Sequence, residues 1–275
     1  MTAPAMVLLA SGSSDDRVAQ VVHTLRKRML GLRPGLCVQL AFVEYGNPSC
    51  LQTATTLSGL DVHEAVFVPL DITRVHRASN AATAAVAEVR KNLKGMASRL
   101  ARPLGPAAEL LTVVDLRLRQ ALSACHASEL DGLVFFAPNT GDARGNALMH
   151  RRARQWRSHH KLPVQVAFGD GSGQTITAAV AALRAQGRRS IAVGFFHIDA
   201  DDVYSTQASL ALEAGAIAVS APLGDDSRLL DLAMARYSVA ALDLLDDVTP
   251  VDLAFDDVPD MATTPTLSLV PATNF

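Results

Sequence analysis

The pentapeptide V-Q-L-A-F at residues 38–42 returns with one substitution as V-Q-V-A-F at residues 164–168, an offset of 126 residues. Two further pairs of segments match at offsets of 127 and 119: A-S-G-S-S-D-D-R at 10–17 with A-P-N-T-G-D-A-R at 137–144, and P-L-G at 103–105 with P-L-G at 222–224. Self-similarity at a nearly constant period is the signature of a repeated architecture, and small loop insertions explain the drift. The chain is therefore predicted to consist of two similar halves.

Both halves show the same order of elements, in which short apolar runs alternate with helix-length periodic segments. This alternation is typical of βα units that build a parallel sheet with both faces covered. Strands are expected near residues 6–10, 36–42, 65–70 and 99–104 in the first half, and near 132–137, 163–168, 190–196 and 216–221 in the second. The predicted fold class is α/β, with two similar lobes that are each a small parallel sheet flanked by helices.

The repeat also suggests the domain boundaries. We expect an N-terminal lobe over residues 1–126 and a C-terminal lobe over residues 127–247. After Asp247 the apolar periodicity stops, and residues 248–275 carry four prolines, several Ser and Thr residues and an acidic cluster. This last segment is expected to be a flexible tail, because it has no apolar face with which to join a core.

The composition excludes several classes of protein. Hydrophobic residues make up 49% of the 275 residues and charged residues 19%, and the formal net charge is −2, so no basic field is available to hold nucleic acid. The three cysteines (Cys37, Cys50 and Cys125) show no CxxC spacing, which argues against a disulfide framework and a thiolate zinc site. No apolar run approaches the roughly 18 residues of a membrane span, and the N-terminal run is too short for a signal peptide. A cytoplasmic protein is expected.

Candidate site residues follow the strands, because ligands of open parallel sheets bind at the carboxyl ends of the strands. These residues are Ser11-Gly12-Ser13-Ser14, Glu44 and 71–76 in the first half, and Asn139-Thr140, Asp170, His197 and Asp199 in the second. Neither S-G-S-S nor G-D-G-S-G at 169–173 has the spacing of a nucleophile elbow, a dinucleotide fingerprint or a P-loop. A plain anion-binding turn at a helix N-terminus stays open.

The order of motifs resembles the sirohydrochlorin chelatases of the CbiX and SirB type, the class II chelatases. The motifs are an apolar strand ending in A-x-G-S-x-D-x-R, then A-F-x-E with N-P-S, then F-V-P-L followed by a histidine, then P-L-G-P, and the likeness covers about residues 6–245. It implies insertion of a divalent metal, Co²⁺ or Fe²⁺, into sirohydrochlorin or a related tetrapyrrole, in sirohaem or cobalamin-type biosynthesis. It implies no organic cofactor, since metal and tetrapyrrole are both substrates, and a monomer or homodimer.

The resemblance also implies site residues. In that family the first strand ends in A-H-G-S, and its histidine works with a second histidine after the third strand to hold the metal in the cleft between the lobes. Here the first position is Ser11 and the second resembles His76, one residue closer to the V-P-L strand than usual, while Glu44 matches the family's acidic position. The expected catalytic residues are therefore His76 and Glu44, with His76 also a metal ligand. Ser11, Gly12 and Ser13 are expected to contact substrate.

The chemistry of metal insertion explains why the departure at Ser11 matters. Imidazole is a good donor for Co²⁺ or Fe²⁺, whereas a neutral hydroxyl is poor. A base near the macrocycle must also take up the two pyrrole protons that the metal displaces. His197, at the end of the third strand of the second half, could face the cleft as a metal ligand and replace the missing imidazole.

Structural alternatives accompany each of these roles. Ser11 could simply cap the following helix, Glu44 could pair with Arg74, and His76 and His197 could be ordinary surface or internally bonded histidines. The remaining histidines lie on helices or helix edges, where solvent exposure is expected: His23, His63, His126, His150, His159 and His160. Two function classes thus stay open: a metal-inserting enzyme, or a degenerate relative that binds a tetrapyrrole or metal without inserting it. Two histidines converging in the cleft would favour the first, and a single one the second.

Overall fold

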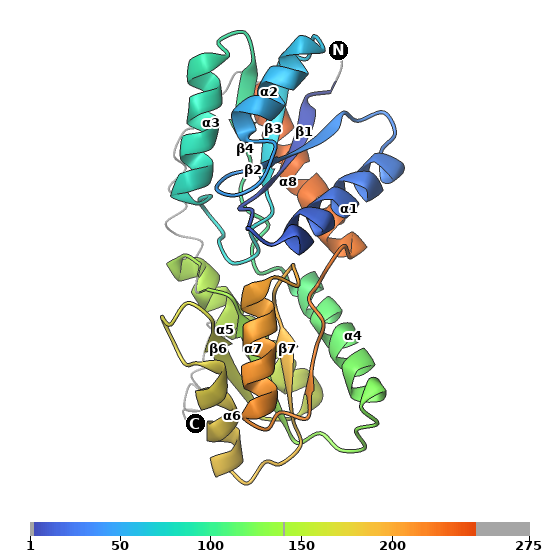
Figure 1. Ribbon diagram of the computed structural model, residues 1–275, viewed down its shortest axis with the longest axis vertical. Coiled ribbons are helices and arrows are strands. Elements are labelled where there is room, and N and C mark those ends of the chain that lie inside the picture. Colours follow the sequence, from blue (N-terminus) through green and yellow to red (C-terminus); the bar gives the residue numbers. More distant parts are fainter. Residues whose placement is uncertain (1–2, 140, 246–275) are drawn as a thin grey trace, which may run out of the picture.

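Strands and helices alternate along the whole of the chain that the computed structural model describes, residues 3–139 and 141–245 (Figure 1). The first half contains β1 (Ala5–Ala10), α1 (Asp16–Leu32), β2 (Val38–Phe42), α2 (Cys50–Gly59), β3 (Glu64–Pro69), α3 (Asn80–Asn92), β4 (Ala97–Leu100) and α4 (Ala108–Ala124). The second half contains β5 (Gly132–Ala137), α5 (Ala143–His160), β6 (Val164–Phe168), α6 (Ile176–Ala185), β7 (Ile191–Phe195), α7 (Asp202–Glu213), β8 (Ala218–Val219) and α8 (Ser227–Leu245). The tail expected at 248–275 lies outside the described residues.

The strands form two four-stranded parallel sheets of the same topology. Their orders are β2-β1-β3-β4 and β6-β5-β7-β8. The two V-Q-x-A-F segments are β2 and β6, which occupy the same edge of their respective sheets. The prediction of two similar α/β lobes is thereby confirmed.

The two strands at the other edge are shorter than expected. The structure has β4 as Ala97–Leu100 and β8 as Ala218–Val219, where the sequence predicted 99–104 and 216–221. Both predicted runs reach toward a P-L-G segment. Pro103 and Pro222 have no backbone N–H to donate, so the ladder cannot continue through them.

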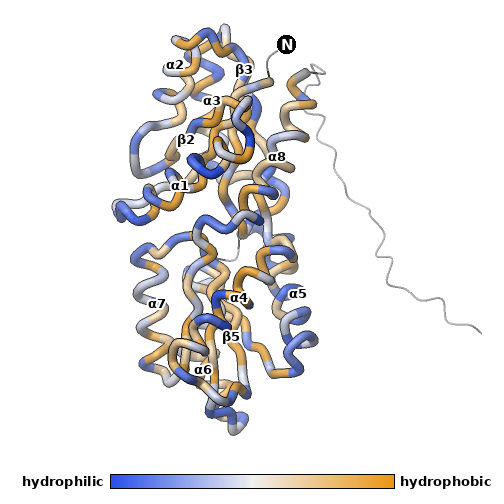
Figure 2. The backbone as a smooth tube through the Cα atoms, turned by 90° about the vertical axis from the view of Figure 1, so that its right-hand side faces the viewer, coloured by the Kyte–Doolittle hydropathy of each residue, from blue (hydrophilic) through white to orange (hydrophobic). Residues whose placement is uncertain are grey.

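The central strands form the core of each lobe. Every residue of β1 and of β5 is buried, as expected for parallel strands that are covered by helices on both faces. Hydrophobic residues follow the strands in the interior of both lobes, whereas the outer helix α5 is largely hydrophilic (Figure 2).

The two lobes exchange a helix. Helix α4 packs against β7 and β8 of the second sheet, although it belongs to the first half of the sequence. Helix α8, drawn in orange-red in Figure 1, returns to pack against β3 and β4 of the first sheet. The Tyr237 hydroxyl on α8 donates to the carbonyl of Pro4 at 2.6 Å, and Arg99 in β4 pairs with Asp243 at 3.1 Å. The domain boundaries at 1–126 and 127–247 stay a prediction. Helices α4 and α8 each lie within one of these ranges but pack against the sheet of the other.

Candidate functional site

The loops that follow the strands of the two sheets meet at the waist between the lobes. Thr73, after β3, donates its hydroxyl to Oδ1 of Asn139, after β5, at 2.7 Å. The backbone N–H of Val75 donates to Oδ2 of Asp142 at 3.0 Å. The carboxyl edges of both sheets, where the sequence placed the candidate residues, therefore lie at one interface.

The Ser11-Gly12 turn is shaped by close approach of the loop after β2. The Ser11 carbonyl accepts the backbone N–H groups of Glu44 at 3.0 Å and Tyr45 at 3.4 Å. Gly12 has φ +82°, and a Cβ placed on it would lie 1.6 Å from the Tyr45 carbonyl oxygen. Glycine is therefore required here by both its conformation and the available space.

Ser11 does not cap helix α1. Asp15 is the N-cap residue, and its carboxylate accepts the backbone N–H of Arg17 at 2.9 Å. Ser13 supports this cap, because its hydroxyl oxygen accepts the N–H of Asp15 at 3.1 Å. The side chain of Ser11 is left exposed at the end of β1.

Gly12→Ala is expected to destabilise the fold by about 2 kcal/mol or more, because the new Cβ would force the Ser11 and Tyr45 loops apart and strain the backbone. Gly35→Ala is the matched control, since a Cβ on Gly35 would meet nothing within 4 Å. Thermal unfolding of both variants measures the difference. Equal melting temperatures would show that the turn tolerates a side chain.

Ser11, Glu44 and His76 follow three adjacent strands. The loop after β1 carries Ser11, the loop after β2 carries Glu44, and the loop after β3 carries His76, in a sheet where β1 lies between the other two. All three residues are exposed. Among the described residues, no hydrogen bond or ion pair joins their side chains. The structure therefore gathers them on one accessible edge without preassembling a closed site.

The surroundings of Glu44 and His76 bear on their alternatives. Arg74, the residue that could have paired with Glu44, instead lies 3.6 Å from Asp71, between Nε and Oδ2. The backbone N–H of His76 donates to Oδ2 of Asp142 at 3.3 Å, which holds its loop against the second lobe. Both candidate side chains thus stay available to a ligand.

His197 has a different environment. Only 7% of its surface is exposed, its Nε2 lies 2.9 Å from Oδ1 of Asp201, and its buried Nδ1 has no hydrogen-bond partner in the described residues. An imidazole held in this way would have to leave Asp201, or offer Nδ1, in order to bind a metal. The role of His197 as a metal ligand stays a prediction.

The repeat clarifies where His197 lies. Leu70 donates its N–H to Leu9 across the first sheet as Phe196 does to Phe136 across the second. Counted from these equivalent residues, His197 corresponds to Asp71, and the loop that follows is four residues shorter in the second lobe, so that α7 begins at Asp202. Asp202 forms an ion pair with Arg17 of the first lobe at 3.1 Å.

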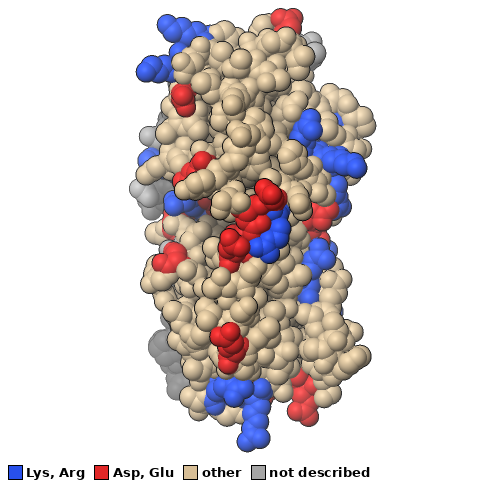
Figure 3. Space-filling model, in the orientation of Figure 1, with Lys and Arg blue, Asp and Glu red and all other residues tan. Residues whose placement is uncertain are grey.

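A group of carboxylates at the waist was only partly recognised from the sequence. Asp199, after β7, has a buried Oδ1 without a partner in the described residues. Burial raises the pKa of Asp199 to about 7; His197 opposes this shift, whereas the nearby charges of Asp201 and Asp15 add to it. Asp15 comes from the first lobe, so sequence proximity does not reveal this group. Figure 3 shows acidic and basic side chains gathered at the waist.

Two hollows of about 420 Å³ each are lined by residues other than Ser11, Glu44 and His76. One runs along α5 and β6 and is lined by His150, Arg154 and Arg157 among others. The other lies between the end of α1 and helix α8, beside Arg33 and Tyr237. Within the described ranges, no helix has both the length and the apolar character to cross a membrane.

Known proteins share this architecture and part of the sequence. Residues 5–121 match the family model CbiX. None of the curated protein sequences matches the chain. Three solved structures of low sequence identity share the fold over most of their length and of this chain.

The first of these structures is SirB from Bacillus subtilis with Fe³⁺, which is 12% identical with a TM-score of 0.73 and covers 89% of this chain and 98% of its own. The sirohydrochlorin chelatase SirB from Bacillus subtilis subspecies spizizenii in complex with cobalt is 11% identical, with a TM-score of 0.68 and coverages of 88% and 96%. CbiX, described as the terminal enzyme for biosynthesis of siroheme in denitrifying bacteria, is 16% identical, with a TM-score of 0.55 and coverages of 86% and 99%. Residues 5–121 thus resemble the CbiX family in sequence, and the described chain shares the two-lobed fold of the SirB and CbiX structures.

Proposed function

We propose that this protein is a metal chelatase that binds a divalent metal at the carboxyl edge of its first sheet and inserts it into sirohydrochlorin or a related tetrapyrrole. The observation that carries the proposal is the gathering of Ser11, Glu44 and His76 on three adjacent loops within the CbiX-matched segment. The SirB structures contain Fe³⁺ and cobalt, which supports Co²⁺ or Fe²⁺ as the metal substrate. The proposal includes a lyase reaction in the cytoplasm by a monomer or homodimer.

The roles of the residues follow from their donor chemistry. The imidazole of His76 and the carboxylate of Glu44 supply a nitrogen and an oxygen ligand, a combination suited to borderline divalent ions. The pyrrole nitrogens lose two protons as the metal enters, and Glu44 and His76 can each accept one as they release the metal to the macrocycle. Ser11 offers a hydroxyl, which is a weak ligand, and Gly12 and Ser13 shape the turn that presents it.

The alternative is a degenerate relative that binds tetrapyrrole or metal without inserting the metal. It is favoured by the state of the imidazoles: His76 is exposed at this edge, whereas His197 is buried and bonded to Asp201. A single accessible imidazole weakens the hold on the incoming metal. Both functions include binding of tetrapyrrole or metal, but only the chelatase would raise the rate of metal insertion above the spontaneous rate.

Insertion can be tested by following the absorbance of sirohydrochlorin with Co²⁺, Fe²⁺ or Ni²⁺ under anaerobic conditions. We expect the native chain to insert metal faster than the spontaneous reaction. His76→Ala should lower the insertion rate at least about tenfold, since mutation of residues that only hold the ligands typically costs 10 to 100-fold in metal affinity or activity. Glu44→Gln should slow insertion while tetrapyrrole binding persists. His23→Ala, an exposed histidine on α1, is the control.

Binding of sirohydrochlorin by the native chain without any rate above the spontaneous one would establish the degenerate relative instead. Equal rates for His76→Ala and His23→Ala would remove His76 from the site.

A further inference from the structure

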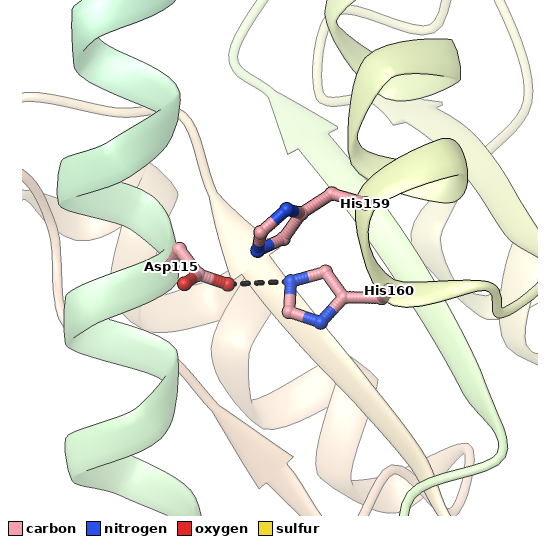
Figure 4. Close-up of side chains that lie close together, drawn as sticks. All are labelled: Asp115, His159 and His160. Atoms are coloured by element: carbon pink, nitrogen blue, oxygen red, sulfur yellow. Dashed lines mark hydrogen bonds and ion pairs between the residues drawn. The ribbon is translucent and has the colours of Figure 1, made fainter.

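Three potential metal ligands meet between helices α4 and α5 (Figure 4). Asp115 lies on α4, and His159 and His160 are the last two residues of α5. One ligand atom from each of the three lies within 4.8 Å of the others. Figure 4 shows a ring nitrogen of His159 facing the contact between Asp115 and His160. The exchange of α4 into the second lobe creates this group, because Asp115 comes from the first half of the chain.

The group is remote from the edge that carries His76. Helix α5 begins at Ala143, beside the waist, and its 18 residues end at His160, just before β6. At 1.5 Å per residue, the helix places His160 about 25 Å from the waist. A ligand bound here would not contact the proposed insertion site.

Asp115 is held as a carboxylate in a partly buried place. Its side chain is 13% exposed, with Oδ1 lying 2.6 Å from His160 Nε2 and accepting the Trp156 indole N–H at 3.3 Å. Arg119 pairs with Oδ2 at 2.7 Å. Burial acts to raise the pKa of Asp115, but these hydrogen bonds and neighbouring positive charges together lower it below its ordinary value. The site thus offers an oriented oxygen ligand.

The two histidines complete a mixed donor set. The His159 and His160 rings lie 4.8 Å apart, centroid to centroid, at 85°. His159 is exposed, whereas the His160 side chain is 20% exposed and already engaged with Asp115. Two imidazoles and one carboxylate, with a fourth position open to water, form a ligand set known from zinc sites. Nitrogen donors also disfavour Mg²⁺ and Ca²⁺.

We propose that Asp115, His159 and His160 bind a borderline divalent cation of the Zn²⁺ type, in a second metal site separate from the one for insertion. The cation replaces the proton that His160 Nε2 shares with Asp115 Oδ1. Bonds of about 2.0 to 2.1 Å at a tetrahedral angle need about 3.3 Å between these two atoms. The present 2.6 Å contact must therefore open by several tenths of an ångström. Arg119 keeps Oδ2 and competes with the cation for the charge of Asp115.

A purely structural role, in which Asp115 fastens the end of α5 to α4, predicts different effects of mutation. Under that role, His159→Ala should leave the melting temperature unchanged both with and without Zn²⁺, because His159 takes no part in the bond between Asp115 and His160. A metal site predicts instead that His159→Ala loses the stabilisation by Zn²⁺. A fastening role also assigns Arg119 a stabilising part, whereas a metal site makes Arg119 a competitor. These two variants therefore separate the readings.

The test is calorimetric titration of Zn²⁺ into the full chain without a polyhistidine tag, with Co²⁺ absorption as a second readout. We expect His159→Ala to bind at least about tenfold more weakly and to lose the Zn²⁺-dependent rise in melting temperature. Arg119→Gln should bind Zn²⁺ more tightly than the native chain. His23→Ala and His76→Ala should both retain this site.

The proposal is overturned if His159→Ala binds Zn²⁺ as the native chain does, or if the native chain binds none. It is equally overturned if His76→Ala abolishes all binding. Because His76→Ala reports on the insertion site alone, failure here leaves the proposed chelatase function untouched.

Discussion

Asp199→Asn is expected to raise the melting temperature of the protein by about 5 to 10 °C at pH 8, and much less near pH 4.5. Burial, with the nearby charges of Asp201 and Asp15, raises the pKa of Asp199 from 3.8 to about 7 in the folded protein. Above pH 7 the folded state must hold an ionised carboxylate whose Oδ1 is buried and has no partner in the described residues. Asparagine keeps the shape without the charge.

The sign of the pH dependence follows from proton linkage. Between about pH 4 and pH 7 the folded protein keeps the proton on Asp199 while the unfolded chain loses it, so the stability of the native protein falls as pH rises. Above pH 7 both states are ionised and the loss levels off at about 2 to 4 kcal/mol. For a chain of this size, each kcal/mol corresponds to about 2 to 4 °C in melting temperature. All other groups titrate in both proteins, so the difference between the two curves isolates Asp199.

Asp202→Asn is the matched control, because the Asp202 side chain is 82% exposed and lies in the same segment. It loses one exposed ion pair with Arg17, which is worth about 1 kcal/mol or less. Its melting curve should therefore follow that of the native protein at every pH. A constant offset between Asp199→Asn and the native protein from pH 4.5 to pH 8 would mean that Asp199 has an ordinary pKa.

The strands of both sheets could be predicted because each central strand is a short apolar segment that is recognisable in the local sequence. Parallel strands covered on both faces form short continuous apolar runs, and β1 and β5 are such runs, buried at every residue. The repeat of V-Q-x-A-F then predicted that two sheets share one topology, as β2 and β6 show. Neither step needs knowledge of contacts between distant parts of the chain.

The exchange of α4 and α8 was not predictable in this way. An amphipathic pattern shows that a helix has a face to bury, but not which sheet receives it. Both helices follow the last strand of their half, and each crosses to the other lobe. The sequence boundary at 126 therefore describes the repeat rather than the packing.

The candidate site likewise has some features that the sequence predicts and others that depend on how the chain packs. Ser11, Glu44 and His76 were placed from the sequence at the carboxyl ends of predicted strands, and the structure has these residues on the loops of three adjacent strands. The hydrogen bond that engages His197 and the carboxylates around Asp199 depend on how loops pack, and Asp15 reaches them from the other lobe. His160 was expected to be solvent-exposed as a helix residue, but it is partly buried against Asp115 of α4. The contacts of Asp15 and Asp115 with the second lobe join residues far apart in the sequence, and the bond of His197 to Asp201 depends on the loop conformation, so neither can be read from the sequence pattern.

Ser11→His is expected to raise the affinity of the waist edge for Co²⁺ by at least about tenfold. The exposed Ser11 side chain stands at the end of β1, and among the described residues its hydrogen bonds are those of its backbone carbonyl with the N–H groups of Glu44 and Tyr45. A histidine there can therefore be introduced without disturbing the turn that Gly12 requires. It would add a good nitrogen donor beside Glu44 and on the same edge as His76, where the hydroxyl is a poor one.

The measurement is calorimetric titration of Co²⁺ in a His159→Ala background, so that the group at Asp115 does not contribute. His76→Ala should lower the affinity of the native chain by at least about tenfold. In the double variant, the gain from Ser11→His should largely disappear, because the two imidazoles would hold one ion together. Ser14→His, at an exposed position of the same loop, is the control for adding a histidine nearby. If Ser11→His gains no more than Ser14→His and His76→Ala loses nothing, this edge is not a metal site, and the likeness to SirB and CbiX is one of fold and ancestry without their chemistry.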